Sequence, residues 1–401
     1  MSDFDDIKFD INDIPVNKAE VVIPGDKIAV RIQQKMASMI SNFKKQFNLD
    51  SPKLVILQVG DLEDAKTYIR NKVKACEMVG ISYEVRHIAT SKLREDGSVF
   101  NFGSFRVFEI IRDTIKELNN DKSVNGIILQ LPIPWHTFGI RPRNYTEDMR
   151  NRDNRDWMEY TTELLCTISR EKDVDGLSES MAARLGLDSQ CHLKPMEQLK
   201  GMDDIEDIDK ITDYFVPATP FGIWYLLHKL YNIKTEGKNV VVIGRSDIVG
   251  KPMAHIMSNK SMGNANVTIL HSKTPEYVLY DKLQKADIVI SAVGKKDGYL
   301  LTKDNIRAGT IVIDAGIVVE HTPDGKRKIR GDADWKNLKD ICKYITPVPK
   351  GVGPMTVTML LYNTMKAWLC QNKLLRRNID IIIENNTDND NSNIDTDSPP
   401  G

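Results

Sequence analysis

The stretch VVVIGRSDIVGKPMA, residues 240–254, predicts a β-strand, a short loop bounded by glycines and the start of a helix. Gly244 ends the apolar run, and Gly250 precedes the helix. The backbone N–H groups of such a loop, together with a helix N-terminus, can face the pyrophosphate of a dinucleotide. The pattern is not G-x-G-x-x-G, because the glycines are six residues apart and Ser246 stands where the middle glycine would be. An ordinary strand–helix turn therefore remains the alternative for this loop taken alone.

The residues around this loop repeat the same alternation of helix and strand. A helix is expected over 219–230, with Thr219 as its N-cap and Pro220 in its first turn. Short apolar strands, separated by helical segments, are expected at 239–244, 266–272, 287–294 and 310–317. This rhythm is typical of a doubly wound sheet that binds a dinucleotide, and it favours the cofactor interpretation of the loop.

The strand after the loop discriminates between the two nicotinamide cofactors. NAD-binding sheets usually carry Asp or Glu at the end of this strand, where the carboxylate holds the ribose 2′-hydroxyl. Here the strand ends LHSKT, residues 270–274, without an acidic residue. Ser272 and Lys273, with Arg245 on the first loop, provide a hydroxyl and two cations that suit a 2′-phosphate. NADP is therefore predicted over NAD, and the alternative is that the two cations are merely solvated.

The first half of the chain shows a second alternation of strands and helices. Its expected helices and strands are 26–47, 54–60, 64–79, 81–88, 103–119 and 126–134. This order predicts a parallel sheet wrapped by helices, so the fold class is α/β. Residues 137–160 are dense in charge and poor in aliphatic side chains, and 188–213 include the acidic piece MDDIEDID. Both stretches are expected to be inserts that leave the core.

Composition and charge limit the possible classes of function. The chain has 401 residues with 55 Lys and Arg against 56 Asp and Glu, so it has no global field for nucleic acid or an anionic membrane. Five scattered cysteines without a C-x-x-C pair favour a reducing compartment.

No apolar run reaches the roughly 18 residues of a membrane span. No His, Cys and carboxylate groups have metal-ligand spacing, so no metal is expected. The acidic N-terminus is unlike a transit peptide, which makes the cytoplasm the expected location.

Seven segments occur in an order that is highly specific in combination. They are TYIRNKVKACEMVGI (67–81), GIILQLPIP (126–134), KDVDG (172–176), PATPFGI (217–223), GRSDIVGKPMA (244–254), HSKT (271–274) and TPVPKGVGPMTVTML (346–360). Together they closely resemble the bifunctional methylenetetrahydrofolate dehydrogenase/methenyltetrahydrofolate cyclohydrolase family. The resemblance covers residues 25–375 apart from the two inserts.

The resemblance implies two α/β domains with a cleft between them and a second domain of Rossmann type. The expected parts are a flexible arm (1–20), a folate-binding catalytic domain (21–214), an NADP-binding domain (215–345), a loop and helix returning to the catalytic domain (346–376) and a disordered tail (377–401). The family oxidises 5,10-methylenetetrahydrofolate with NADP⁺ and hydrolyses the 5,10-methenyl product to 10-formyltetrahydrofolate at the same site. A homodimer formed through the cofactor domain is expected from the same resemblance, with no nucleic-acid or membrane partner.

The resemblance also assigns residues to the folate site. Tyr68 and Lys72 match the family's Y-x-x-x-K and lie on one helix face. Lys72 would move protons in the cyclohydrolase step, Gln130 would hold its amine, and Asp175 would orient the pterin ring. The expected substrate-binding residues are Tyr68, Lys72, Leu129, Gln130, Leu131, Asp175, Pro349, Lys350, Gly351, Val352 and Gly353. Spacing alone allows a solvated lysine and a strand-end polar group at Gln130, and Asp173 competes with Asp175 unless it caps a turn.

The cofactor residues follow from the same comparison of motifs. Those expected to bind NADP are Thr219, Gly244, Arg245, Ser246, Ile248, Val249, His271, Ser272, Ala292, Gly294, Ile317, Gly353 and Thr356. The residue at 317 follows DAG, where the family contacts the nicotinamide through the backbone. His271 by itself would more often be structural than catalytic. The loop from Pro349 to Gly353 is expected to lie between folate and nicotinamide, because its glycines allow close backbone approach.

The chain departs from the family pattern at several positions. Ala65 replaces a serine before the tyrosine, Lys350 replaces a glycine of PVPGGVGP, and GIV replaces GIN after the fourth strand. The family pattern PCTP-x-G is replaced here by PATPFG, with Ala218 and Phe221. All expected proton-transfer groups remain, but Ala65 leaves a dehydrogenase without cyclohydrolase activity as an alternative. A folate- or nucleotide-binding module without catalysis is the alternative from another class.

Overall fold

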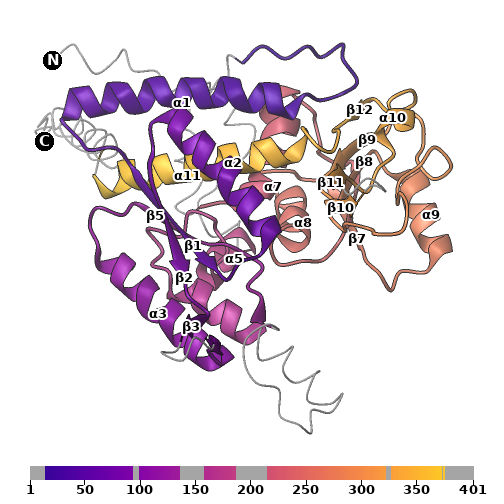
Figure 1. Cartoon of the computed structure of the whole chain (residues 1–401). Coiled ribbons are helices and arrows are strands. Elements are labelled where there is room, and N and C mark those ends of the chain that lie inside the picture. The colour runs from indigo at the N-terminus through magenta and orange to yellow at the C-terminus, as the bar shows by residue number, and fades with distance from the viewer. Residues whose placement is uncertain are drawn as a thin grey trace, which may run out of the picture.

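The computed structural model describes residues 14–93, 99–135, 158–186, 215–321, 327–372 and 374. The described chain forms two lobes, each built on its own parallel sheet (Figure 1). The expectations for 137–157, 188–213 and 377–401 lie outside these residues. The residues 158–167, at the end of the first expected insert, are helical.

The sheet of the first lobe has the order β2-β1-β5, with both pairs parallel. Its central strand is almost wholly buried, as the apolar run LVILQV predicts for a strand covered on both faces. The elements of this lobe are α1 (Gly25–Phe47), β1 (Lys53–Val59), α2 (Glu63–Val79), β2 (Ser82–Ile88), β3 (Ser91–Leu93), β4 (Val99–Asn101), α3 (Ser104–Asn120), β5 (Gly126–Leu129) and α5 (Glu179–Gly186). β5 ends at Leu129, so this strand is shorter than the expected 126–134 and stops before Pro132.

The sheet of the second lobe has the order β12-β9-β8-β6-β7, and all its pairs are parallel. Its elements are β6 (Asn239–Ile243), α8 (Gly250–Ser258), β7 (Asn266–Leu270), α9 (Glu276–Lys285), β8 (Ile288–Ser291), β9 (Ile311–Asp314), β10 (Val318–His321), β11 (Arg327–Arg330), α10 (Trp335–Leu338) and β12 (Tyr344–Ile345). The four expected strands are all present. The antiparallel hairpin of β10 and β11 was not predicted. The order reverses next to β6, which is the point where such sheets bind ligands.

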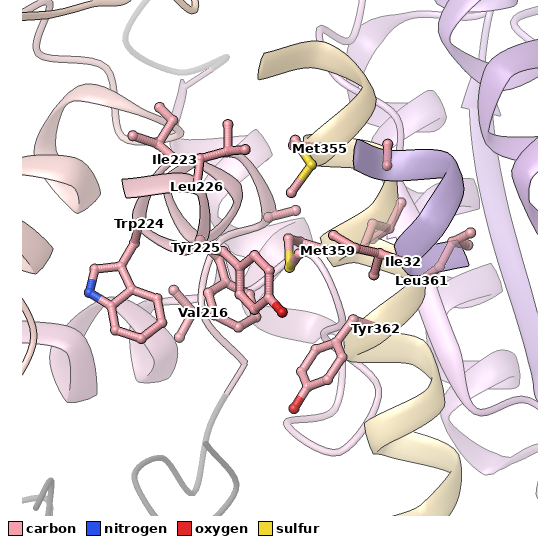
Figure 2. Close-up of a cluster of buried hydrophobic side chains, with 14 of the residues drawn as sticks. Ile32, Val216, Ile223, Trp224, Tyr225, Leu226, Met355, Met359, Leu361 and Tyr362 are labelled. Atoms are coloured by element: carbon pink, nitrogen blue, oxygen red, sulfur yellow. The ribbon is translucent and has the colours of Figure 1, made fainter. Parts of the chain in front are cut away.

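A continuous apolar core joins the two lobes. It lies where α1 meets α7 (Ala218–Trp224), the π-helical turn η4 (Tyr225–Leu230) and α11 (Val352–Gln371). Figure 2 shows Tyr225, Met359 and Tyr362 packed together in this layer. Each large side chain buried there contributes about 1.5–3 kcal/mol relative to exposure to water. The two sheets are therefore held together by packing and not by a linker alone.

The last helix contacts the first lobe along its length. Gln33 of α1 donates through Nε2 to Oγ1 of Thr358 at 2.8 Å. Farther along, Asn125 donates to Gln371 Oε1 at 2.8 Å, and Gln371 Nε2 donates back to the Asn125 carbonyl at 3.0 Å. In Figure 1, α11 accordingly runs from the second lobe along α1.

Three expectations about local structure are wrong. The expected arm is not loose throughout its described part, 14–20. Ile14 is buried in the core and the Lys18 backbone carbonyl accepts a hydrogen bond from the Tyr344 hydroxyl at 3.1 Å, while 17–20 are exposed. Thr219 is not an N-cap, because the backbone is already helical at the preceding residue and the cap is Pro217. Val352 and Gly353 belong to the first turn of α11, so the loop before that helix is shorter than expected.

Candidate active site

Lys72 meets Gln130 where α2 faces the end of β5. The backbone N–H of Gln130 donates to the Leu57 carbonyl at 2.9 Å, which continues the strand pairing by one residue. Its side-chain Nε2 donates to the Leu131 carbonyl at 2.8 Å, and this fixes the direction of the amide. Oε1 then accepts a hydrogen bond from Lys72 Nζ at 2.9 Å. The two residues expected to cooperate are therefore in direct contact.

The surroundings of Lys72 lower the affinity of its amine for a proton. Burial lowers the pKa of Lys72 from its usual value, while the carboxylate of Asp175 acts in the opposite direction. Burial likewise raises the pKa of Asp175, and the lysine partly offsets that effect. Burial raises the pKa of Cys76, one turn along the helix, to about 12, so this thiol stays protonated. A lysine with a lowered pKa can accept and return a proton nearer to neutral pH.

The three charged residues of KDVDG have three different surroundings. Lys172 Nζ donates to the carbonyls of Leu118, Asn119 and Asp121 at 2.7–2.9 Å and so closes the C-terminus of α3. Asp173 is fully buried and accepts the backbone N–H groups that follow it, including Ser178 N at 3.0 Å. The turn-capping role therefore belongs to Asp173. Within the described residues the half-buried Asp175 carboxylate accepts no hydrogen bond, which leaves it available to a ligand.

A buried amide that the sequence did not single out holds the loop of Asp175. Asn363 of α11 donates through Nδ2 to the carbonyls of Val174 at 2.9 Å and Val216 at 3.0 Å. It thereby ties the substrate-side loop to the start of the second lobe. An amide in the middle of a largely apolar helix was the available signal, since a buried amide needs partners.

Tyr68 lies one turn before Lys72 on α2, and its ring is exposed. An exposed aromatic ring beside the amine suits stacking on a planar ligand. Ala65 lies one turn farther back and is buried. Leu129 and Leu131 flank Gln130; the first is buried in the core of the first lobe, and the second is half-buried against it.

The glycine loop after β6 has the geometry of a phosphate cradle. Gly244 has φ 117°, and a Cβ there would lie 2.7 Å from the Ala292 carbonyl oxygen. Ser246 Oγ accepts the N–H groups of Val249 at 3.2 Å and Gly250 at 3.3 Å, so the serine shapes the start of α8 in place of a glycine. Its hydroxyl proton remains available to a phosphate oxygen. The Arg245 side chain is exposed.

The turn after β7 presents the predicted polar groups to the same edge of the sheet. His271 Nδ1 accepts the backbone N–H of Lys273 at 3.2 Å, and Thr274 Oγ1 accepts that of His271 at 3.0 Å. The histidine therefore shapes the turn, while Ser272 and Lys273 are exposed.

Exposed apolar side chains lie beside these polar groups. Ile248, Val293 and Ile317 follow β6, β8 and β9 and are 41–47% exposed. Gly294 lies close to the last of them, because a Cβ there would be 2.9 Å from the Ile317 carbonyl oxygen. Val293 was missed in the sequence, although it stands between the predicted residues Ala292 and Gly294. These side chains can cover the flat rings of a dinucleotide.

The start of α11 connects the two groups of residues. Thr219 and Thr356 share a hydrogen bond of 3.0 Å between their hydroxyls, which joins the N-termini of α7 and α11. The short loop before α11, with Pro349 at its centre, leads directly from β12 of the second sheet. Lys350 in this loop has φ 88°, and its amine lies 3.8 Å from the Asp26 carboxylate on α1.

Replacing Lys350 by glycine is expected to raise the free energy of unfolding by about 0.5–1 kcal/mol. A side chain in left-handed backbone is strained, and glycine removes the strain but gains entropy in the unfolded chain. The exposed ion pair with Asp26 contributes little. Urea denaturation measures the change. Lys350→Ala is the matched control, because it loses the ion pair and keeps the strained Cβ. A glycine variant no more stable than the alanine variant would contradict this interpretation.

Two properties of the described ranges bear on other classes of function. No group of three or more His, Cys, Asp or Glu residues in these ranges is arranged to hold a metal ion. None of their helices combines the length and apolarity required to cross a membrane.

Comparisons with known proteins agree with this geometry. Residues 23–147 match the family described as tetrahydrofolate dehydrogenase/cyclohydrolase, catalytic domain, and residues 217–372 match its NAD(P)-binding domain. Among curated relatives, the bifunctional protein FolD of Mycoplasma mycoides is 35% identical over 348 residues, which are 87% of this chain and 96% of that protein. The FolD of Staphylococcus aureus (strain Newman) is 34% identical over 90% of this chain and 98% of its own length.

Solved structures show the same architecture. The bifunctional FolD of Campylobacter jejuni superimposes with a TM-score of 0.64 and 31% identity, over 86% of this chain and 96% of that one. The Trypanosoma brucei methylenetetrahydrofolate dehydrogenase-cyclohydrolase, solved with NADP and an inhibitor, gives a TM-score of 0.67 at 26% identity, over 90% and 98% of the two chains. The two-domain α/β prediction is thereby confirmed. Because both domains match and the likeness extends over nearly the whole length of these relatives, the chain belongs to the tetrahydrofolate dehydrogenase/cyclohydrolase family.

Proposed function

We propose that this protein oxidises 5,10-methylenetetrahydrofolate with NADP⁺ and then hydrolyses the 5,10-methenyl product to 10-formyltetrahydrofolate. The observation that carries the proposal is the contact of 2.9 Å between the Lys72 amine and Gln130, in a chain that also has an NAD(P)-binding domain. A dehydrogenase alone would not need a lysine with a lowered pKa at this place. A binding module without catalysis would need neither that lysine nor its orienting amide.

The oxidation removes a hydride from the carbon that bridges N5 and N10 of the folate. Bound NADP⁺ accepts this hydride on its nicotinamide ring, and the folate becomes the methenyl cation. The chain contributes orientation: Tyr68 stacks on the folate, and Asp175 accepts hydrogen bonds from the amino-pyrimidinone edge. The support for Asp175 is that its neighbour Asp173 already has backbone partners, whereas its own carboxylate faces Lys72. Charge-assisted bonds to a planar edge fix orientation as well as affinity.

The hydrolysis needs a group that takes a proton from water and delivers one to nitrogen. Water adds to the cationic carbon and loses a proton to the neutral Lys72 amine. The bond from this carbon to N5 then breaks, and N5 receives the proton from Lys72. The added hydroxyl loses its own proton to solvent, and the carbon remains on N10 as a formyl group. Gln130 holds the amine through Oε1, and its own Nε2 is fixed by Leu131. The positive charge of the substrate further disfavours the ammonium form of the lysine.

The second lobe is proposed to bind NADP through the carboxyl ends of its strands. The pyrophosphate faces the loop from Gly244 to Ser246 and the N-terminus of α8, which begins at Gly250. Arg245, Ser272 and Lys273 hold the 2′-phosphate. Ile248, Val293 and Ile317 cover the rings, because their apolar side chains are exposed at this edge.

The decisive experiment supplies methylenetetrahydrofolate and NADP⁺ and follows NADPH, methenyl and 10-formyl products together. The proposal predicts NADPH formation with an equal amount of 10-formyltetrahydrofolate and no lasting methenyl absorbance. Accumulation of the methenyl cation would show a dehydrogenase without cyclohydrolase activity. Absence of NADPH, with folate still bound, would show a binding protein.

We infer further that two copies associate through the cofactor domain. The support is β7, the edge strand of the second sheet, which exposes Ile269, and the neighbouring α9, which exposes Tyr277 and Tyr280. An apolar edge strand without a partner strand tends to associate. Light scattering should give twice the mass of the chain, and Ile269→Lys should give a monomer. The matched control is Ile329→Lys on β11, which should remain dimeric; a monomeric unmodified protein would contradict the inference.

We place this activity in the cytoplasm, where 10-formyltetrahydrofolate supplies purine biosynthesis. The support is the pair of buried free thiols, Cys76 and Cys342, which are compatible with a reducing compartment.

A further inference from the structure

The segment after β8 is held from outside its own sheet by one buried carboxylate. Asp332, which follows β11, has no exposed surface. Its Oδ2 accepts hydrogen bonds from Ser291 Oγ at 2.7 Å and Val293 N at 2.9 Å, and its Oδ1 accepts one from Lys295 N at 2.8 Å. All three donors belong to the stretch that contains Ala292 and Gly294. The carboxylate therefore holds this stretch at every second residue from 291 to 295.

The same short piece of chain holds the far end of this segment. The backbone carbonyl of Asp332 accepts hydrogen bonds from Leu300 N at 2.7 Å and Leu301 N at 3.1 Å. Two residues earlier, the buried Arg330 donates to the carbonyls of Lys296 at 2.7 Å and Gly298 at 3.0 Å. Residues 330–332 thus bind the segment 291–301 along its length.

The Asp332 carboxylate also contacts the backbone around Gly316, which precedes Ile317, and so limits how closely this backbone approaches the 291–295 stretch. A Cβ on Gly316 would lie 2.2 Å from Asp332 Oδ2, so this backbone rests directly against the carboxylate. Asp314 also holds this backbone, because its carboxylate accepts the N–H groups of Gly316 at 2.9 Å and Ala333 at 2.8 Å. Ile317 follows immediately. One side chain therefore contacts both 291–295 and the turn that presents Ile317.

We propose that Asp332 is a positioning residue for the cofactor. It fixes the spacing between the 292–294 segment and Ile317, and the nicotinamide ring lies between these two. This inference rests on the proposed function. A fully buried carboxylate is costly unless its lone pairs are satisfied, and an apolar side chain would stabilise the fold at least as well. What the carboxylate adds is direction, because hydrogen bonds to two backbone N–H groups and to the Ser291 hydroxyl hold this stretch more tightly than packing alone.

The test is Asp332→Asn, which keeps the shape and turns an amide N–H toward a backbone N–H. NADP⁺ affinity is measured by calorimetry without folate, and KM values are measured for both activities. The expected result is a rise of about tenfold or more in the Kd and KM for NADP⁺. The hydrolysis rate with supplied methenyltetrahydrofolate should stay within about twofold of the unmodified enzyme, because that step uses the first lobe. Asp334→Asn, the same change two residues along, is the matched control and should leave NADP⁺ affinity unchanged.

Two outcomes with the Asp332→Asn variant would overturn the proposal. One is a folded Asp332→Asn variant that binds NADP⁺ as well as the unmodified enzyme. The other is an equal loss of both activities, which indicates a purely structural role. If the asparagine variant does not fold, Ser291→Ala decides, because it removes a single donor and should weaken NADP⁺ binding about threefold; unchanged binding there rejects the proposal. Calorimetry on the unmodified chain separates this question from the proposed function, since NADP⁺ binding without turnover would reject only the latter.

Discussion

The Lys72→Met variant is expected to lose cyclohydrolase activity while retaining part of its hydride transfer. The amine is the group proposed to take a proton from the attacking water, and methionine has similar length but no proton acceptor. General acid–base catalysis contributes about 10²–10⁴-fold, so hydrolysis of supplied methenyltetrahydrofolate should fall by that factor. NADPH formation needs no proton transfer from this side chain and should fall much less. With methylenetetrahydrofolate and NADP⁺, the variant should accumulate the methenyl cation.

The matched control for this variant is Lys74→Met. Lys74 is on the same helix two residues away and is exposed, so its replacement should change neither rate. Full hydrolysis by the Lys72 variant would overturn the role assigned to the amine. A parallel loss of both activities would place Lys72 in substrate binding and not in proton transfer.

The Arg245→Ala variant is expected to lose the preference for NADP⁺ over NAD⁺. The exposed guanidinium on the loop after β6 is the proposed partner of the 2′-phosphate, a group that NAD⁺ lacks. A hydrogen bond to a charged group contributes about 1.5–3 kcal/mol, so the KM for NADP⁺ should rise by about 10–100-fold. The KM for NAD⁺ should change by less than about threefold.

Arg307→Ala is the control of the same chemical type. Its guanidinium contacts Asp287 and the Ala286 carbonyl just before β8. These lie at the amino ends of the strands, whereas the proposed NADP site lies at their carboxyl ends. This variant should therefore keep the unmodified ratio of the two KM values. Equal changes for NADP⁺ and NAD⁺ in the Arg245 variant would remove the 2′-phosphate assignment.

Much of the fold was predictable because its information is local. The apolar runs of β1 and β6 end in glycine, and helical spacing follows each of them, so two parallel sheets were expected from periodicity alone. The predictions that were wrong concern residues whose partners are distant in sequence. Thr219 looked like an N-cap, but its hydroxyl pairs with Thr356 and the helix starts earlier. Ile14 looked like part of a loose arm, but it fills a place in the joint core.

The candidate site likewise has a part that the sequence predicted and a part that it did not. The contact between Lys72 and Gln130 was anticipated through the family resemblance, and spacing alone would have left that lysine as a solvated charge. The supporting groups were not anticipated. Asn363 reaches Val174 across 189 positions, and Asp332 reaches Ser291 across 41, distances at which local periodicity holds no information. A buried polar residue in an apolar surrounding is the only trace that such a contact leaves in one sequence.

The most direct measurement of the central idea, one folate site for two reactions, is inhibition of both activities by a single unreactive folate analogue. Methylene oxidation and methenyl hydrolysis are assayed on one preparation at the same NADP⁺ concentration. A shared site predicts competitive inhibition of both reactions with the same inhibition constant. An analogue that saturates and blocks one reaction while the other proceeds at its full rate would contradict it.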